Sequence, residues 1–279
     1  MNTSSFRRLA VVGMGLLGGS AALAARERGV VGEVRGVDPN LRDAGGIELV
    51  SLVQAAGWAD CVLLAVPIEA MEQVLREMAP HIGAETLITD LASVKAPMAE
   101  LARRVLSVPE NCVGAHPMTG GHQSGFAHAR ADLFVGAACI ITPAGREPPQ
   151  VVDRIDEFWQ CLGAVTVRRA PEEHDAIAAV LSHVPHVIAF AFAGGLPGQD
   201  VLRLAGPGLR DFIRIARADP ALWCEILLRN RGRVAEEIAR FEKDLGKISD
   251  ALGRGDRVAL EEALEKGQTR AKHVDPSGD

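Results

Sequence analysis

The sequence predicts an α/β protein in which an N-terminal, doubly wound and mostly parallel sheet is followed by an all-helical C-terminal part. The first half alternates short apolar runs with helical stretches, the pattern of a parallel sheet covered by helices. From residue 172 onward only helical patterns occur. The 279 residues are ample for two domains. We therefore place the domains at residues 1–170 and 171–279.

Seven short runs in the first domain are expected to be strands, because each is largely apolar and lies between helical or turn-forming segments. They cover residues 9–12, 34–37, 61–66, 87–90, 111–115, 138–142 and 165–168. A helix is expected over residues 18–28. Pro67, Pro117 and Pro143 each come just after a strand, where the loops at the carboxyl edge of the sheet should lie.

The second domain opens with Pro171-Glu172-Glu173, a favourable start for a helix, with an early proline and acids in the first turn. Near the end, apolar residues repeat with spacings of four and three on one long helix. They are Val234, Ile238, Phe241, Leu245, Ile248 and Leu252. This seam packs against its own domain or against a second subunit. We expect a homodimer formed through the helical domain.

Composition excludes several classes of function. The chain is 48% hydrophobic and 24% charged, so it is not disordered as a whole. A net charge of −6 and an aromatic content of 4% disfavour nucleic acid as a partner. The absence of Tyr excludes a mechanism that needs a tyrosine acid. Five widely spaced cysteines, without any C-x-x-C, are typical of reduced thiols in a cytoplasmic protein.

Two apolar segments could suggest a membrane. Arg7-Arg8 before the apolar residues 9–25 imitates a signal peptide. Residues 176–196 are also apolar, but they contain Ser182, His183, Pro185 and His186, which are costly when they face lipid. We expect a buried helix of a soluble domain there, and no membrane association.

The run Gly13-Met14-Gly15-Leu16-Leu17-Gly18 fits G-x-G-x-x-G between an expected strand and helix, and Asp38 lies 20 residues after Gly18. This context predicts a Rossmann-like dinucleotide site rather than a signal peptide. Gly13 allows the tight turn, Gly15 lets a pyrophosphate approach, and Gly18 allows close helix packing. Asp38 would accept hydrogen bonds from the ribose and repel a 2′-phosphate, so NAD is favoured over NADP. Val66 and Pro67 are expected to line the same cofactor site.

Two segments that follow expected strands carry candidate catalytic residues. They are residues 91–95, with Ser93, and residues 115–120, with His116. Both should lie at the carboxyl edge of the sheet, beside the nicotinamide. A neutral His116 could accept a proton from a substrate hydroxyl as its carbon loses hydride, and Ser93 could share that hydrogen bond. Position at this edge favours such roles over a purely structural histidine.

The second domain contains two further candidate sites. His183 and His186 are three apart on a helix interrupted by Pro185, but no suitably spaced ligand makes them a metal site. We expect core packing for His183, a substrate-site role for His186, and no metal. Arg210 and Arg214 lie four apart, on one face of an expected helix. Arginine forks bind carboxylates, so an anion site is favoured there over a solvated basic face.

Five motifs in this order resemble the prephenate/arogenate (cyclohexadienyl) dehydrogenase family of tyrosine biosynthesis. They are residues 13–20 (GMGLLGGS), 90–95 (DLASVK), 114–120 (GAHPMTG), 182–186 (SHVPH) and 208–216 (GLRDFIRIA), with Trp223 beyond. The resemblance covers nearly the whole chain. It implies an N-terminal nucleotide-binding domain and a helical C-terminal dimerisation domain.

The resemblance also implies an activity, the NAD-dependent oxidative decarboxylation of a cyclohexadienol dicarboxylate. Prephenate would give 4-hydroxyphenylpyruvate and CO₂, and arogenate would give tyrosine and CO₂. By resemblance, His116 is the catalytic acceptor and Ser93 assists it. Arg214 matches the arginine that holds a substrate carboxylate, and Arg210, His186 and Trp223 match positions that line the substrate site.

One departure concerns the side chain of the substrate. The family often has Thr-Glu after the His-Pro-x-x-Gly motif, where this chain has Gly121-His122-Gln123. Gly121 and His122 are expected to border the substrate, so prephenate, arogenate and 4-amino-4-deoxyprephenate all stay open. Another two-domain hydroxyacid dehydrogenase or imine reductase is disfavoured, because the lysines after residue 171 all lie near the C-terminus. A non-enzymatic NAD sensor is disfavoured by the presence of Ser93, His116 and Arg214.

Overall fold

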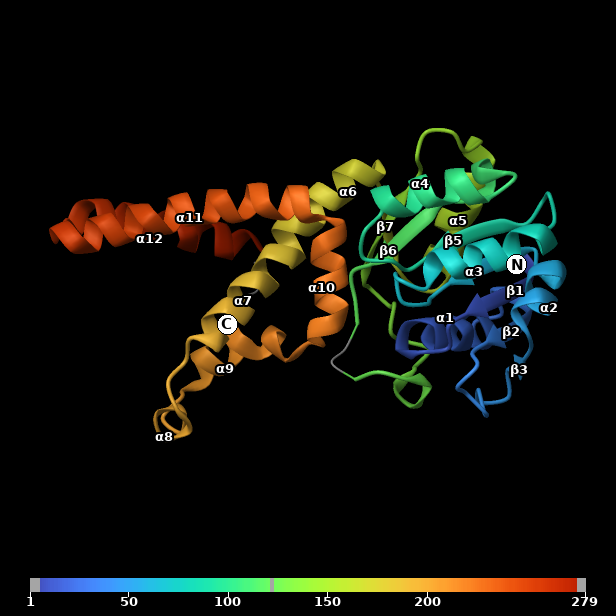
Figure 1. The fold of residues 1–279 in the computed structure, drawn as a ribbon, viewed down its shortest axis with the longest axis horizontal. Coiled ribbons are helices and arrows are strands. Elements are labelled where there is room, and N and C mark those ends of the chain that lie inside the picture. The colour runs from blue at the N-terminus through green and yellow to red at the C-terminus, as the bar shows by residue number, and fades with distance from the viewer. Residues whose placement is uncertain (1–5, 121–122, 275–279) are drawn as a thin grey trace. The chain divides into compact units, whose positions relative to one another are not determined.

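The computed structural model describes residues 6–120 and 123–274, and within them a parallel five-stranded sheet forms the centre of the N-terminal part (Figure 1). Its strand order is β3-β2-β1-β4-β5, so the chain winds outward from β1 in both directions. The strands are β1 (Phe6–Val12), β2 (Val31–Val37), β3 (Glu48–Leu49), β4 (Cys61–Leu64) and β5 (Leu87–Asp90). The predicted doubly wound sheet is confirmed. Sequence reasoning missed β3, which is only two residues long.

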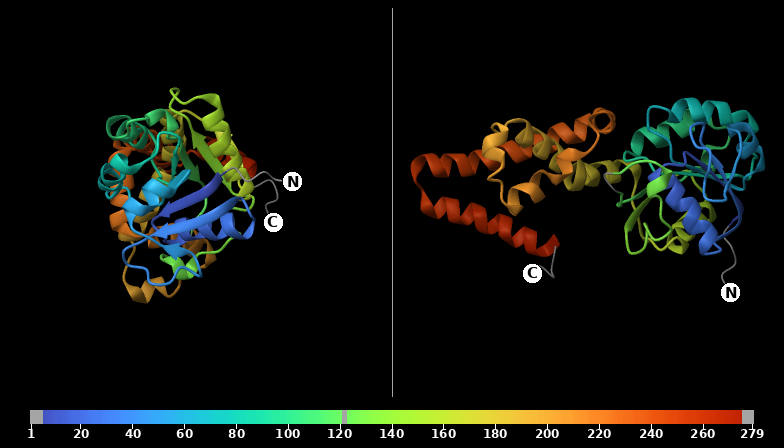
Figure 2. Two further views of the ribbon diagram at one scale, coloured as in Figure 1. Left: turned by 90° about the vertical axis from the view of Figure 1, so that its right-hand side faces the viewer. Right: turned by 90° about the horizontal axis from the view of Figure 1, so that it is seen from below.

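Helices cover both faces of this sheet (Figure 2). Leu9 and Val11 of β1 pack into a core with α1 and α5, whereas Ala10 and Val12 pack into a second core with α2, α3 and α4. Burial on both faces explains why the central strands are continuously apolar. The helices of this part are α1 (Leu16–Glu27), α2 (Leu52–Trp58), α3 (Met71–Met78), η1 (Ala79–His81), α4 (Ala96–Val105), η2 (Pro109–Asn111), η3 (Phe126–His128) and α5 (Pro149–Cys161).

Three further strands, β6 (Gly114–Pro117), β7 (Ala138–Thr142) and β8 (Val165–Arg168), form a second sheet in the order β6-β7-β8. The strands are mostly parallel, as predicted, with one exception: β6 is antiparallel to β7, while β7 and β8 are parallel. Parallel neighbours need a crossover, and the described part of the β6–β7 connection contains only the short η3. A parallel bridge between Ile88 and Cys112 aligns β6 with β5. The carboxyl end of β6 therefore lies at the same edge as that of β5.

The described chain is helical beyond Pro171, as predicted. The first of these helices runs through one π-helical turn, η4, into α7, where Pro185 is the second residue. Proline lacks an N–H group and crowds the preceding turn, so a wider turn lets the helix continue instead of breaking there. The elements up to residue 229 are α6 (Pro171–Ala178), η4 (Ala179–His183), α7 (Val184–Gly194), α8 (Gln199–Leu202), α9 (Pro207–Ile213), η5 (Arg214–Arg217) and α10 (Pro220–Arg229).

The helical run Pro171–Gly194 is the one in the described residues that is long and apolar enough to cross a membrane, with a mean hydropathy of 1.8. Only 28% of its apolar window is buried within this chain. Leu181 is 66% exposed and Phe192 49% exposed. The expectation that this helix is buried in its own domain is therefore wrong for much of its surface. The short elements packed against it, α9 and η5 among them, are too small to enclose it.

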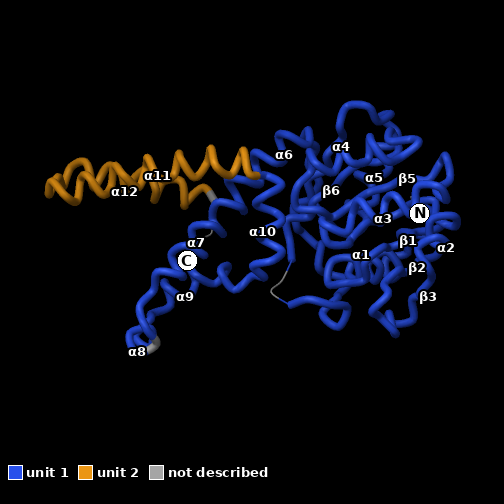
Figure 3. Tube along the Cα trace, viewed as in Figure 1, with its two compact units in different colours: residues 1–230 blue, residues 231–279 orange. Residues whose placement is uncertain are grey.

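Contacts divide the chain into two compact units, residues 1–230 and 231–279 (Figure 3). In the second unit, α11 (Arg231–Arg254) and α12 (Arg257–Val274) form a helical hairpin. Gly255, with a φ of +66°, ends α11, and the Asp256 side chain accepts the amide of Ala259 at the start of α12. The apolar repeat over residues 234–252 lies on one helix, as predicted. The boundary at 170/171 between the two predicted domains stays a prediction.

Candidate active site

The glycine-rich loop joins β1 to α1 and requires glycine at two positions. Gly13 has a φ of +95°, and a Cβ on it would lie 2.5 Å from the carbonyl oxygen of Ala65. A Cβ on Gly18 would lie 1.9 Å from the carbonyl oxygen of Gly13. Around Gly15, by contrast, no heavy atom lies within 4 Å of the Cβ position. The loop thus packs tightly against the sheet and leaves open space beside the N-terminus of α1.

That open space suits a phosphate group. Gly15 is the N-cap of α1, and the first turn begins with Leu16 and Leu17. Amides of the first helical turn have no acceptor within the helix, and the helix dipole is positive there. The residues present therefore fit the pyrophosphate of a dinucleotide.

A cavity of about 580 Å³ continues from the loop along the ends of β1 and β2. Asp38 lines it, and its carboxylate accepts the amides of Met14, at 3.2 Å, and Asn40, at 2.9 Å. Val66 and Pro67 line the same cavity. A carboxylate on the wall beside β2 fits the ribose hydroxyls of an adenosine group.

His116 lies within β6 rather than in the loop after it. Ala115 and Pro117, its neighbours, are buried in the sheet, whereas His116 is half-buried. Side chains alternate between the two faces of a strand, so His116 faces away from the side that Ala115 and Pro117 occupy. Its Nδ1 atom lies 2.8 Å from Nε2 of His174 on α6. The strand thus presents His116 near the carboxyl edge of the sheet, as expected for a site residue.

Sequence reasoning missed His174 and Asp175. His174 is fully buried, and its Nδ1 lies 2.8 Å from Oδ1 of Asp175. The carboxylate of Asp175 also accepts the amides of Lys95, at 2.7 Å, and Ala96, at 3.0 Å, at the start of α4. The only sequence signal was the pair of polar residues early in a helix, which is equally typical of a solvated first turn.

Both histidines are held in the neutral form. Burial lowers the pKa of His116 well below its ordinary value, and the nearby Lys95 cation lowers it further. Burial also lowers the pKa of His174, although the hydrogen bond to Asp175 works in the opposite direction. At neutral pH, His116 is therefore available as a proton acceptor.

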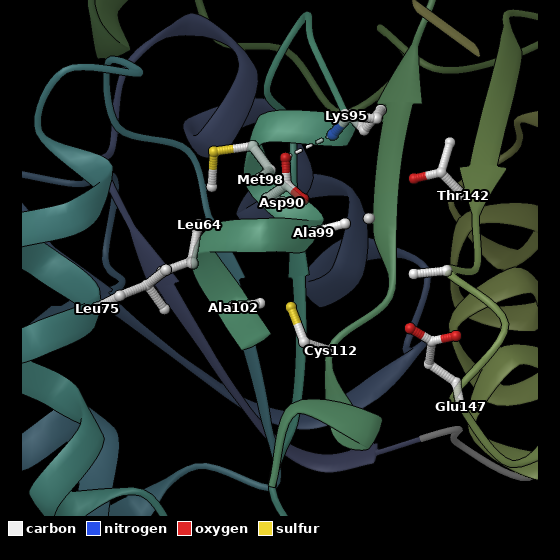
Figure 4. Close-up of a pocket in the computed structure, with 12 residues that line it drawn as sticks. Leu64, Leu75, Asp90, Lys95, Met98, Ala99, Ala102, Cys112, Thr142 and Glu147 are labelled. Atoms are coloured by element: carbon white, nitrogen blue, oxygen red, sulfur yellow. Dashed lines mark hydrogen bonds and ion pairs between the residues drawn. The ribbon is translucent and has the colours of Figure 1, made fainter. Parts of the chain in front are cut away.

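A buried ion pair fixes the backbone just before His116 (Figure 4). Nζ of Lys95 lies 2.5 Å from Oδ1 of Asp90 and donates to the carbonyl oxygen of Ala115 at 2.6 Å. Gly114 is closely packed there, since a Cβ on it would lie 2.5 Å from Oγ1 of Thr142. The adjoining cavity, of about 10 Å³, is about large enough for one water molecule. The ion pair thus ties β6 to the end of β5.

Ser93 lies in the loop between β5 and α4 and is half-buried. In the described part of the chain, its hydroxyl makes no hydrogen bond to His116. The structure therefore places the two residues on neighbouring elements without a direct hydrogen bond between their side chains.

Two residues expected in the substrate site, His186 and Trp223, contact each other. Their rings stack with centroids 3.6 Å apart, and Nδ1 of His186 lies 2.9 Å from the carbonyl oxygen of Ser182. His183 also packs against Trp223, with centroids 6.1 Å apart. His186 on α7 and Trp223 on α10 thus form one aromatic wall.

The two arginines do not share one regular helix. Arg210 lies on α9, which ends at Ile213, and Arg214 begins the 3₁₀ helix η5. One regular helix therefore does not carry both residues, and the expectation that they share one face stays a prediction. Both residues are exposed. The segment that carries Arg214 packs against α7, the helix of His186.

His183 has a structural environment, as expected. Its Nδ1 lies 3.1 Å from the Asn230 side-chain amide, and burial lowers its pKa to about 4. Among residues 6–120 and 123–274, no group of three or more His, Cys, Asp or Glu side chains could hold a metal ion. Gly121 and His122, expected beside the substrate, lie outside the described residues.

Two family models match the chain consecutively. The prephenate dehydrogenase nucleotide-binding domain matches residues 21–168, and the prephenate dehydrogenase dimerization domain matches residues 170–266. Prephenate dehydrogenase of Bacillus subtilis is 33% identical over 265 residues, which are 90% of this chain and 71% of the relative. Cyclohexadienyl dehydrogenase of Zymomonas mobilis is 31% identical over 278 residues, which are 94% of each chain.

Solved structures agree with these matches. Prephenate dehydrogenase of Aquifex aeolicus, in complex with hydroxyphenyl propionate and NAD⁺, superposes with a TM-score of 0.89 at 29% identity, covering 96% of this chain and 98% of that one. Arogenate dehydrogenase of Synechocystis gives a TM-score of 0.82 at 26% identity, covering 95% and 99%. The chain therefore belongs to the prephenate/arogenate (cyclohexadienyl) dehydrogenase family.

Proposed function

We propose that this protein catalyses the NAD⁺-dependent oxidative decarboxylation of prephenate or of a closely related cyclohexadienol. The observation that carries the proposal is His116, a neutral imidazole at the same edge of the sheet as the glycine-rich loop. Hydride transfer from a carbinol carbon needs such a base within reach of the nucleotide. The prephenate, cyclohexadienyl and arogenate dehydrogenases that resemble this chain support the choice of substrate class.

The residues of the glycine-rich loop and its cavity would hold the cofactor. Gly13, Gly15 and Gly18 shape the loop, and Leu16 and Leu17 begin the helix that faces the pyrophosphate. Asp38 would accept hydrogen bonds from the ribose, with Val66 and Pro67 along the same wall, and its charge favours NAD⁺ over NADP⁺. When bound, NAD⁺ supplies the acceptor for the hydride.

His116 would act on the ring hydroxyl. As hydride leaves the ring carbon that bears the hydroxyl, the hydroxyl proton moves to His116, with Ser93 sharing the hydrogen bond. The ring carboxylate then leaves as CO₂, and the electron pair of the broken C–C bond enters the ring. The proton returns to the oxygen, which becomes a phenol. Aromatisation of the ring provides the driving force.

The substrate has two carboxylates, and the helical part supplies cations for them. We assign Arg214 to one carboxylate and place Arg210, His186 and Trp223 along the substrate site, with Gly121 and His122 at its border. The packing of η5 against α7 supports this grouping, because it brings the segment of Arg214 to the helix of His186.

We also propose that the protein is a homodimer of the cytoplasm. The match of residues 170–266 to a dimerization domain supports the first part. The exposed Leu181 and Phe192 give that domain an apolar surface that a second copy would cover. Five cysteines without a disulfide among the described residues support a reducing compartment.

The test is an assay of NADH formation with prephenate, arogenate and 4-amino-4-deoxyprephenate, run side by side. We expect turnover of at least one of them with NAD⁺ and much weaker turnover with NADP⁺. The substrate used best identifies the side chain that the Gly121-His122 segment accepts. Failure with all three substrates would end the proposal and favour an NAD-binding protein without this activity.

A further inference from the structure

A continuous hydrogen-bonded row of three side chains runs from His116 into the protein. Nδ1 of His116 lies 2.8 Å from Nε2 of His174, and Nδ1 of His174 lies 2.8 Å from Oδ1 of Asp175. His174 is 0% exposed and Asp175 4% exposed. The proton positions in such a row can be assigned once one of its atoms is known to accept a hydrogen bond without being able to donate one.

The inner end of the row is an acceptor. Oδ1 of Asp175 accepts the amide of Lys95, and Oδ2 accepts the amide of Ala96. A carboxylate engaged in this way at a helix N-terminus has only acceptor capacity left for His174. The backbone carbonyl of Asp175 in turn accepts the side-chain amide of Asn230 at 2.8 Å. Asp175 is thus fixed from several sides.

The remaining protons follow in order. Nδ1 of His174 must carry a proton to donate to Asp175, so Nε2 of a neutral His174 holds a lone pair. Nδ1 of His116 must then donate to that lone pair. The acceptor nitrogen of a neutral His116 is therefore Nε2, the nitrogen that faces away from His174.

We propose that His174 and Asp175 are positioning residues that hold His116 in the tautomer whose Nε2 accepts the substrate proton. This inference rests on the proposed function of His116. When His116 becomes an imidazolium, its Nδ1–H still donates to Nε2 of His174, and Nδ1–H of His174 still donates to Asp175. The logic is that of a catalytic triad, in which a buried carboxylate sets the tautomer and orientation of the base. Here a second histidine lies between the two.

Other ionisable groups surround the row without changing this order. Lys95 and His183 lie near both histidines, and Asp90 lies near His174. Lys95 is paired with Asp90 and donates to the backbone of Ala115, and His183 contacts Asn230. None of these contacts involves the ring nitrogens of His116 or His174.

The first experiment measures the tautomer directly, in the resting protein without substrate. The chain has eight histidines, so ring nitrogens labelled with ¹⁵N can be resolved by NMR, with the signal of His116 identified by its loss in His116→Asn. We expect Nδ1 of His116 to be protonated and Nε2 to be unprotonated. A proton on Nε2 would overturn the proposal.

The second experiment compares two amides at one position. The amide of Gln in His174→Gln can reach the place of Nε2 and accept from His116, whereas that of Asn in His174→Asn reaches only the place of Nδ1. We expect His174→Asn to lower kcat roughly tenfold, which is part of the 10²–10⁴-fold contribution typical of general-base catalysis. We expect His174→Gln to retain most of the wild-type kcat. KM and NAD⁺ affinity should stay within about twofold.

Three outcomes would contradict the positioning role. They are an equal loss of kcat in the two variants, no loss of kcat in His174→Asn, and a change confined to KM. The tautomer measurement needs no turnover. A protein that has the expected tautomer but converts no cyclohexadienol would therefore disprove the proposed function and leave the hydrogen-bonded row intact.

Discussion

The sheet region and the helical region that follows it bury their apolar residues in different ways. In the sheet region, all four residues of β4 are buried by helices of the same chain. In the helical region, Leu181 is 66% exposed, Leu204 85% and Leu222 47%. The core of the sheet region is built mainly from its own residues and takes in only Trp223 and Ile226 of α10, whereas the helical region leaves large apolar side chains exposed. With the proposed second copy on that surface, the stability of the helical region should depend more strongly on protein concentration than that of the sheet region.

The largest expected effect tests whether the chemistry belongs to the sheet region. His116→Asn removes the proton acceptor and should lower kcat by about 10²–10⁴-fold, with NAD⁺ affinity nearly unchanged. Steady-state kinetics and a cofactor titration measure the two quantities. His128→Asn, at an exposed position, is the matched control and should behave as wild type. Turnover near the wild-type rate in His116→Asn would remove the assigned role.

The next prediction addresses the two modes of burial. Leu63→Ala opens a cavity in the sheet core and should lower the free energy of unfolding by about 2–5 kcal/mol at any protein concentration. Leu181→Glu adds a charge to the exposed apolar surface and should shift the protein toward monomer. Denaturation at two concentrations and analytical ultracentrifugation measure these changes. A Leu181→Glu protein that stays dimeric would place the interface elsewhere.

A smaller effect is expected for substrate binding by the helical region. Arg214→Ala should raise KM about 10- to 100-fold, since a hydrogen bond to a charged group contributes about 1.5–3 kcal/mol. Arg217→Ala, on the same short helix η5, is the matched control. An unchanged KM in Arg214→Ala, or an equal rise in both variants, would exclude the carboxylate contact.

A separate effect is a pH dependence of stability. Burial lowers the pKa values of His116, His174 and His183 in the folded protein, that of His183 to about 4. Below the ordinary value of 6.5 the unfolded chain binds more protons, so folded stability falls as the pH drops through that value. The slope is at most about 1.4 kcal/mol per pH unit for each histidine. Denaturant unfolding at pH 7 and pH 5 measures it, and His183→Phe should flatten the curve.

Local sequence was a good guide to the sheet region. Apolar runs in β4, β5, β7 and β8 predicted strands at or near the observed positions, because burial on both faces leaves a continuous apolar pattern. The glycine spacing identified the nucleotide loop, since only glycine tolerates the close approach at Gly13 and Gly18. The antiparallel pairing of β6 escaped prediction, because pairing direction depends on the path of the connection and not on the residues of the strand.

The sequence by itself therefore determined the order of elements, the glycine-rich loop, the family and the histidine expected to act as the base. Only the tertiary structure decided which residues surround that histidine. His174 follows His116 by 58 residues, and nothing in its helix distinguishes a solvated first turn from a buried hydrogen-bonded row. The exposure of the helix over Pro171–Gly194 was likewise decided by what packs against it. Hydrogen-bond partners and burial are properties of folded neighbours, which a local pattern of residue types does not specify.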